Sequence, residues 1–330
     1  MIVRDSIYGQ FKIEDKVIVE LLKDPSIIRL KKVTQGGTID ILKIHKDFSR
    51  YDHSIGCMLL IRYLGGSLNE QIAALLHDIS HTAFSHVGDV VYKKDENKES
   101  YHELIKKDYI YKSNILNILK KYNLNVDYIE NEKNFTLLEK PLPDICADRI
   151  DYSLRSLYVY QNKKSKAKKY FKHLIKYNNE IMFDDKDIAI EYSRDFLNLD
   201  INIYNNIVNR TSYYILSDVI KRALKLSIIK ESDLLEYDQY VFNKIKKTKD
   251  TKINLLISKL NKDLKPKQVS RKQISLKNYK YKIINKVRFV NAKFINNQKV
   301  EYSLDYDLKL KKDIREHRDK YKKLMYVNID

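Results

Sequence analysis

Histidines gather in one short stretch of this chain. Five of the eight histidines lie within 50 residues, and one of them directly precedes an aspartate at the end of an apolar run. Neutral imidazoles and carboxylates bind borderline divalent metals, and a bound metal activates water or polarises a phosphoryl oxygen. These residue types and their spacing predict a metal-dependent hydrolase of a phosphorylated substrate. The cluster comprises His53, His77-Asp78, His81, His86 and His102.

Two predicted helices carry the first of these residues. A helix over 52–63 would place His53 in its first turn. Ser67 and Glu70 have the spacing of a capping box, and the apolar residues that follow predict a buried stripe ending at His77-Asp78. A single histidine on such a helix is more often a core residue. An adjacent His-Asp pair followed by two more histidines within nine residues favours metal ligands at the edge of a cleft.

A third predicted helix follows Asp144. In it Asp148, Tyr152 and Arg155 fall at i, i+4 and i+7, so they share one face. A carboxylate, a phenol and a guanidinium on one face suit a phosphate-binding cleft that contains a metal. The alternative interpretation is an ordinary ion-paired stripe on the surface.

Glycine is too scarce for a glycine-rich phosphate loop. All seven glycines lie at or before Gly88, and neither a P-loop motif nor a GxGxxG motif occurs. A P-loop or Rossmann phosphate site is therefore excluded. Any phosphate must be held by metal, His, Lys and Arg.

The chain is predicted to be mainly α-helical, with a smaller mixed α/β region at its C-terminal end. Helices are expected at 187–198 and 200–228, and the lysine-rich residues 161–169 are expected to form an exposed loop. Further on, 279–290 and 292–302 alternate with period two around Asn296-Asn297-Gln298, which predicts a hairpin, and 321–328 predicts another strand. We place the boundary between a helical domain, 1–235, and a basic C-terminal region, 236–330.

Positive charge is concentrated in the C-terminal region. Residues 241–300 carry 18 Lys or Arg against two Asp, which is +16 of the formal net charge of +19. A coding bias towards lysine does not explain why acidic residues become so rare there. The segment, in which lysines alternate with Tyr279, Tyr281 and Phe289, is interpreted either as an anion-binding surface for nucleotide phosphates or nucleic acid, or as a solvated face.

Composition also indicates the cellular compartment. A hydrophobic content of 43% is that of a globular chain, and only Cys57 and Cys146 occur, so no disulfide framework is expected. No apolar run reaches the roughly 18 residues of a membrane helix, and no secretory signal opens the chain. We expect a cytoplasmic protein that does not enter a membrane.

The ordered motifs resemble a known family. The pattern H…HD…D, formed by His53, His77-Asp78 and Asp148, resembles the HD-domain phosphohydrolase superfamily. Within it, five stretches of residues 1–235 are similar to the deoxynucleoside triphosphate triphosphohydrolases (dNTPases), which include the SAM-and-HD-domain protein of animals and shorter bacterial relatives. These stretches are RDSIYGQFKI, RYDHSIG, LLHDISHTAFSH, YHE and DRIDYSLRS. The resemblance implies an HD-type helical bundle for the first domain.

The resemblance also implies roles for individual residues. It implies that His53, His77, Asp78 and Asp148 hold one divalent metal. This metal would be Fe, Mn, Ni or Zn, and Mg accompanying the substrate is another option. It implies catalytic roles for His81, His86, Asp89, His102 and Glu103, with His102 as a phosphate contact and Glu103 as an orienting carboxylate. It implies that Arg50, Arg149 and Tyr152 bind substrate phosphates and that Gln35 lies against the deoxyribose. By analogy, the protein forms a homo-oligomer.

Two departures from the family pattern leave alternatives open. Ser156 stands where the family has an acidic residue near the sugar. Lys23, Ile28 and Lys31 stand at the positions that match an Asp, a Gln and an Arg, which bind activating guanine nucleotide in the regulated animal enzyme. The leading hypothesis is cleavage of a dNTP to deoxynucleoside and triphosphate. The alternatives are hydrolysis of a monophosphate, a ribonucleotide or a cyclic nucleotide, and a nucleic-acid-binding HD protein that uses residues 241–300.

Overall fold

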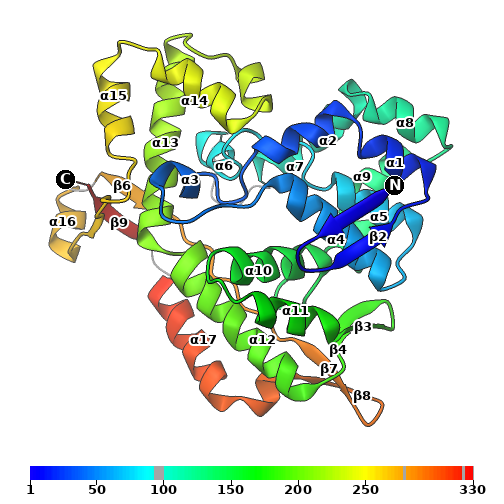
Figure 1. Cartoon of the computed structure of the whole chain (residues 1–330). Coiled ribbons are helices and arrows are strands. Elements are labelled where there is room, and N and C mark those ends of the chain that lie inside the picture. Colours follow the sequence, from blue (N-terminus) through cyan, green and yellow to red (C-terminus); the bar gives the residue numbers. More distant parts are fainter. Residues whose placement is uncertain (93–99, 278–279, 322–323, 330) are drawn as a thin grey trace.

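The computed structural model describes residues 1–92, 100–277, 280–321 and 324–329 (Figure 1). The chain is 56% helical with a few small sheets, which confirms the expected mainly α class. An N-terminal hairpin pairs β1 (Ile2–Asp5) with β2 (Gly9–Lys12). The helices of the first half are α1 (Lys16–Leu21), α2 (Pro25–Arg29), α3 (Ile39–Leu42), α4 (Arg50–Tyr63), α5 (Leu68–Leu76), α6 (Val87–Tyr92), α7 (Tyr101–Lys112), α8 (Ile115–Lys121), α9 (Val126–Glu130) and α10 (Ala147–Val159).

The second half mixes helices with short strands. Its helices are α11 (Lys164–Lys172), α12 (Lys186–Leu199), a π-helical turn at Asp200–Tyr204, α13 (Ile207–Lys225), α14 (Asp238–Lys246), α15 (Thr251–Ser258), α16 (Arg271–Ser275) and α17 (Leu308–Tyr321). Its strands are β3 (Leu174–Tyr177), β4 (Glu180–Phe183), β5 (Lys267–Gln268), β6 (Tyr281–Ile283), β7 (Lys293–Asn296), β8 (Lys299–Tyr302) and β9 (Met325–Asn328).

Helix α4 is central to the larger hydrophobic core, because it packs against both α5 and α10. Its first turn is closed by a capping box, in which Ser49 accepts from the Asp52 amide and the Asp52 carboxylate accepts from the Ser49 amide. The helix therefore begins at Arg50, two residues before the predicted start. Its buried apolar side chains hold it in place between its two neighbours.

The C-terminal residues divide between two sheets and two cores. Strand β7 pairs antiparallel with β8 and parallel with β4, giving the order β3-β4-β7-β8, while β9 lies between β5 and β6. Val290, Ala292 and Phe294 belong to the larger core with α4 and α10, whereas Tyr281 and Ile283 belong to a second core around α13 and α15. The boundary at 235/236 remains a prediction, and residues from both of its sides share each core.

The hairpin prediction is confirmed in part. Strands β7 and β8 turn at Asn297-Gln298, where both residues have positive φ. The first predicted arm is wrong, because β6 pairs with β9 instead; Tyr279, at its start, lies outside the described residues. The strand predicted at 321–328 is confirmed in part: β9 covers Met325–Asn328, Tyr321 ends α17, and residues 322–323 lie outside the described part.

Two helical predictions are corrected. Residues 161–169 do not form a loop, because α11 begins at Lys164 and buries Ala167, Tyr170 and Phe171 on one side while its lysines stay outside. The single helix expected at 200–228 is interrupted by the π-helical turn before α13 begins.

The capping box predicted at Ser67 is half formed: Ser67 accepts from the Glu70 amide, but the Glu70 carboxylate accepts from the Leu137 amide.

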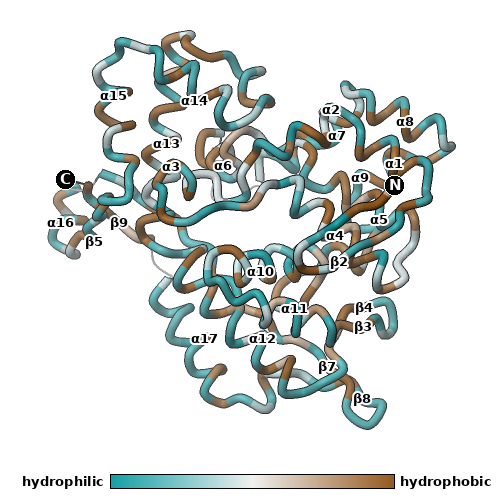
Figure 2. Tube along the Cα trace, in the orientation of Figure 1, coloured by the Kyte–Doolittle hydropathy of each residue, from teal (hydrophilic) through white to brown (hydrophobic). Residues whose placement is uncertain are grey.

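The basic segment 241–300 runs through α14, α15, α16 and strands β5 to β8, from one end of the molecule to the other (Figure 1). Figure 2 shows that α17, which follows it, is largely hydrophilic along its length. Nucleic-acid binding by this segment remains a prediction. Among the helices of the described ranges, none is both long and apolar enough to cross a bilayer.

Phe294 provides a test of how the C-terminal hairpin is anchored. Its ring is fully buried, its residue is in register with Phe183 of β4, and it packs edge-on against Tyr306. We expect Phe294→Ala to lower the free energy of unfolding by about 3–5 kcal/mol, the usual cost of removing a buried phenyl ring. In urea denaturation, Val300→Ala on β8, where the side chain is 37% exposed, is the matched control. If both variants lost the same free energy of unfolding, β7 would not be anchored in the core through Phe294.

Candidate metal centre

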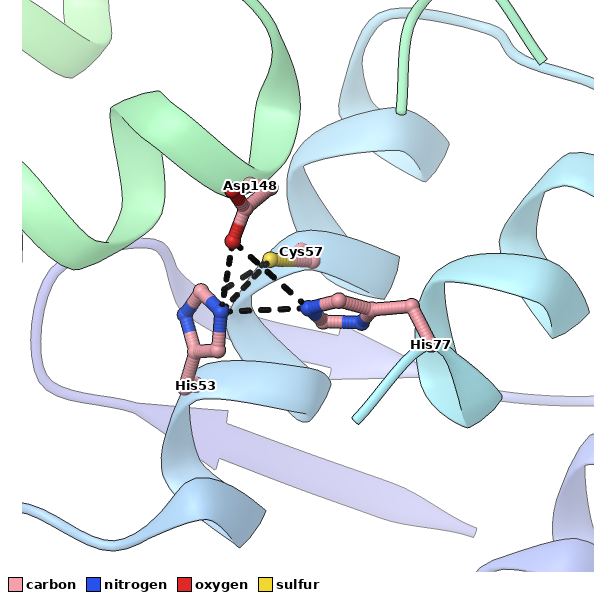
Figure 3. A group of neighbouring side chains, drawn as sticks. All are labelled: His53, Cys57, His77 and Asp148. Carbon is pink, nitrogen blue, oxygen red and sulfur yellow. Dashed lines mark hydrogen bonds and ion pairs between the residues drawn. The ribbon is translucent and has the colours of Figure 1, made fainter. Parts of the chain in front are cut away.

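Three helices bring four ligand atoms together. His53 lies in the first turn of α4, His77 caps the C-terminal end of α5 with Asp78 next to it, and Asp148 lies in the first turn of α10. His53 Nε2 lies 2.9 Å from Asp148 Oδ1 and 3.2 Å from His77 Nε2. Asp78 Oδ2 lies 3.6 Å from both imidazole nitrogens. Figure 3 shows His53, His77 and Asp148 pointing toward one another.

The outer nitrogen of each imidazole fixes how its ring faces the centre. His77 Nδ1 donates to the Ala74 carbonyl oxygen at 2.7 Å, and His53 Nδ1 lies 2.7 Å from Asp151 Oδ2. Since a carbonyl oxygen only accepts, the proton of neutral His77 is on Nδ1 and the lone pair is on Nε2. Such outer hydrogen bonds orient metal-binding histidines.

The electrostatics of this group favour a cation. Burial alone would lower the pKa of His77, but Asp78 and Asp148 outweigh it and raise that pKa to about 10. Burial is likewise outweighed at His53, where hydrogen bonds with Asp148 and Asp151 raise the pKa. Two nitrogens and two carboxylate oxygens that converge in this way fit a divalent first-row metal. The residues present therefore suit the predicted metal.

Arg50 is buried beside the candidate metal ligands. It is only 2% exposed. Its Nη1 donates to Asp78 Oδ2 at 2.6 Å and its Nε donates to Ser85 Oγ at 2.9 Å. Its Nη2 is buried without a hydrogen-bond partner among the described residues. A buried, unsatisfied guanidinium nitrogen beside metal ligands is a donor available to phosphate.

The other predicted histidines lie on the far side of Asp78. His81 Nε2 is 3.2 Å from Asp78 Oδ1, and the His81 ring stacks on His102 with centroids 3.7 Å apart. His86 Nδ1 lies 2.9 Å from Asp89 Oδ2, and Asp89 Oδ1 accepts from the Tyr101 amide. Burial lowers the pKa of both His81 and His86. Neutral imidazoles in this position can transfer protons.

The comparisons with known proteins identify an HD domain in this part of the chain. The HD domain family model matches residues 50–155, a range that includes all four candidate ligands. The Bacillus subtilis protein YdhJ is 36% identical over 331 residues, covering 100% of this chain and 99% of that protein. The metal-dependent phosphohydrolase cns2 of Cordyceps militaris is 31% identical over 249 residues, covering 73% of this chain and 72% of that protein.

This chain belongs to the HD-domain metal-dependent phosphohydrolases. A solved phosphohydrolase structure from Bacteroides thetaiotaomicron has the same fold, with a TM-score of 0.67 and 16% identity over 100% of both chains. Members of this family act with a divalent metal, for which His53, His77, Asp78 and Asp148 are the candidate ligands.

Two residues beside the HD centre were not singled out from the sequence. Cys57, one helical turn after His53, places its Sγ 3.7 Å from His53 Nδ1, and burial raises the pKa of its thiol well above the ordinary value. Asp151, one turn after Asp148, is fully buried against His53. The i+4 and i+3 spacings were visible in the sequence, but only the packing of α4 against α10 shows that both side chains face His53.

The contacts of Arg155 differ from the prediction that Asp148, Tyr152 and Arg155 form a phosphate-binding face on α10. Its Nε donates to Asp151 Oδ2 at 2.8 Å and its Nη2 donates to Asp5 Oδ2 at 2.7 Å. The side chain therefore supports the carboxylate behind His53 and is not directed at phosphate. Gly56 permits this close packing, because a Cβ there would lie 1.9 Å from Asp151 Oδ1.

The remaining predicted residues lie around this centre with different partners. The Tyr152 ring is 6.5 Å from the His53 ring. Arg149 donates to Glu139 and to the carbonyl oxygens of Asp144 and Lys140. Glu103 is exposed and caps α7 by accepting from the Ser100 amide. The Gln35 Oε1 atom is buried without a partner among the described residues.

The ligand assignment predicts loss of metal on double substitution. Changing His77 and Asp78 together to Ala should abolish bound metal and activity, because two of four ligands disappear, while circular dichroism keeps its helical signal. The control is His173→Ala with Asp184→Ala, which removes an exposed His–Asp pair 2.7 Å apart in the same chain. Elemental analysis that finds full metal occupancy in the first double variant would reject the assignment.

The hydrogen bond between Asp151 and His53 Nδ1 predicts a smaller loss of metal binding than the double substitution. Asp151→Asn removes the charge that orients the imidazole, so metal affinity should fall about 10–100-fold. Asp195→Asn is the control, since Asp195 is also a buried carboxylate and accepts from Tyr170 Oη at 2.6 Å. Competition with a fluorescent chelator measures the metal affinity of both variants. Equal metal affinities for the two variants would show that Asp151 does not support the centre.

Proposed function

We propose that this HD phosphohydrolase cleaves a deoxynucleoside triphosphate to deoxynucleoside and triphosphate. The observation that carries the proposal is Arg50, which holds metal-ligand Asp78 with one nitrogen and keeps another buried and unpartnered. Both ring nitrogens of His81 are also buried without hydrogen-bond partners among the described residues. Arg50 Nη2 and the single N–H of the neutral His81 ring are donors that support an anion-binding face beside the candidate metal ligands.

The chain's own groups divide the work of the reaction. When bound, the metal supplies a Lewis acid that polarises phosphoryl oxygen and activates water. Arg50 stabilises the negative charge that develops on the phosphoryl group. His86, whose Nδ1 is held by Asp89, presents the lone pair of Nε2, which can orient attacking water and accept its proton. His102, stacked on His81, adds a further phosphate contact. Glu103, the proposed orienting carboxylate, accepts from the Ser100 amide in this structure.

Hydrolysis of another nucleotide is the alternative, and Ser156 favours it. Ser156 is 1% exposed, and its hydroxyl accepts from Tyr204 Oη at 3.0 Å. It therefore does not offer the acidic contact to a sugar that the dNTPase pattern contains. A dNMP, a ribonucleotide or a cyclic nucleotide would then be the substrate. Homo-oligomer formation also remains a proposal.

A nucleotide panel decides between these substrates. Purified protein with Mn²⁺ is incubated with each dNTP, ATP, dAMP and a cyclic nucleotide, and the products are identified by chromatography. We expect deoxynucleoside and triphosphate in equal amounts from a dNTP, and slower turnover of ATP and dAMP. The double variant of His77 and Asp78 controls for contaminating phosphatases. Absence of both products from all dNTPs would overturn the proposal, and faster turnover of dAMP would favour the alternative.

A further inference from the structure

Two loops of the candidate site lie against each other next to Arg50. The Gln35 loop comprises residues 34–37, and the Phe84 loop comprises residues 82–86. The Ser85 hydroxyl, in the Phe84 loop, donates to the Thr34 carbonyl oxygen at 2.5 Å and accepts from Arg50 Nε at 2.9 Å. The position of the Arg50 guanidinium is therefore tied to the contact between the two loops.

This contact constrains the backbone of both loops. A Cβ on Gly37 would lie 2.4 Å from the Phe84 carbonyl oxygen, so the chains approach each other closely there. Phe84 and Ser85 have positive φ angles of 62° and 50°, a conformation that residues other than glycine rarely adopt. Such backbone angles persist only where surrounding contacts hold them. Another part of the chain must therefore fix the Phe84 loop.

A carboxylate from the C-terminal region binds both loops. Asp238, the first residue of α14, accepts from the Phe84 amide with Oδ1 at 2.7 Å. Its Oδ2 accepts from the Thr34 amide at 2.9 Å and from the Thr34 hydroxyl at 2.7 Å. Burial raises the pKa of Asp238 to about 6, and these hydrogen bonds oppose the rise. At neutral pH the group is therefore largely ionised, and each of its oxygens holds one loop.

The residues just before Asp238 contact the same part of the site. The Leu234 carbonyl oxygen accepts from the Ala83 amide at 2.7 Å, and the Glu236 carbonyl oxygen accepts from Arg29 Nη1 at 2.9 Å. Arg29 Nη2 donates to the carbonyl oxygens of Ile79 and His81, both at 2.9 Å. Residues 234–238 thus lie along the backbone that follows the HD doublet, and Asp238 links them to the Gln35 loop.

We propose that Asp238 is a positioning residue of the phosphohydrolase site, which joins the Gln35 loop to the Phe84 loop and so holds Arg50 in place for phosphate. The inference rests on the proposed phosphate-binding role of Arg50, but not on which nucleotide is cleaved. Arg50 in turn donates to the candidate ligand Asp78. Because the HD domain model matches residues 50–155, Asp238 gives a residue outside that domain a part in its site.

Binding of orthophosphate tests this positioning without requiring turnover. The full-length protein is loaded with one equivalent of Mn²⁺ and titrated with orthophosphate in a calorimeter. In Asp238→Asn one carboxylate oxygen becomes an NH2 group, which cannot accept from an amide, so one loop loses its partner. We expect orthophosphate to bind about tenfold more weakly, the usual effect of losing one hydrogen bond to a charged group. Elemental analysis should find unchanged bound Mn²⁺.

Asp250→Asn is the matched control for loss of a structural carboxylate. Asp250 is also half-buried in the C-terminal region, and it accepts two hydrogen bonds from Arg222 and one from the Ile253 amide. This variant should bind orthophosphate as the unmodified protein does. Thr34→Val is a milder test, because it removes only the hydroxyl that donates to Asp238, and it should weaken orthophosphate binding about threefold. If Asp238→Asn does not fold, Thr34→Val decides.

The outcomes separate this inference from the proposed function. Unchanged orthophosphate affinity in the folded variants of Asp238 and Thr34, or an equal loss in Asp250→Asn, would overturn the positioning role. Selective loss in Asp238→Asn supports it even if the unmodified protein cleaves no dNTP, a result that would overturn only the proposed function. Cleavage of dNTPs with the same kcat and KM in Asp238→Asn would support the proposed function and reject the positioning role.

Discussion

The burial of His53 between two carboxylates is the constraint on which the rest of the site depends. Asp148 and Asp151 approach its two ring nitrogens from the same helix, and no part of the imidazole reaches solvent. Buried charges of this kind are unfavourable unless each is compensated. The structure compensates them with alternating charges, since Arg155 and then Asp5 follow behind Asp151. A divalent metal bound by the candidate ligands would add a further positive charge to this network.

This alternation explains why elements remote in sequence must meet. Asp5 ends β1 of the N-terminal hairpin, Arg155 lies in the middle of α10, and Gly56 of α4 gives the space in which their network fits. A side chain larger than hydrogen at residue 56 would collide with the Asp151 carboxylate. The hairpin thus contributes to the site through charge although it carries no candidate ligand. The dense packing of α4 against α10 keeps water away from these pairs and so strengthens them.

Local spacing in the sequence was sufficient to predict the helices that carry the candidate ligands, whereas the ligand set itself was implied by the resemblance to HD-domain phosphohydrolases and stays a prediction. His53 in a first turn and His77-Asp78 at a helix end follow from caps and apolar periodicity, which act over a few residues. The partners of Arg155 could not be predicted, because helical spacing places its Cβ on the face of Asp148 but does not determine where a long side chain ends. The helix at 164–172 was missed for a related reason: its lysines dominate the composition, whereas three buried apolar residues determine its structure.

The distribution of charge also shows the difference between what composition predicts and what tertiary contacts determine. Sequence locates an excess of positive charge in residues 241–300, but that segment extends over two sheets and several helices. Most of its cations therefore act at separate places on the molecule. The short stretch between β6 and β7 is held in one place, because its backbone carbonyl oxygens accept from Arg210 and Asn205. Tertiary hydrogen bonds, more than the number of lysines, therefore determine where this stretch lies.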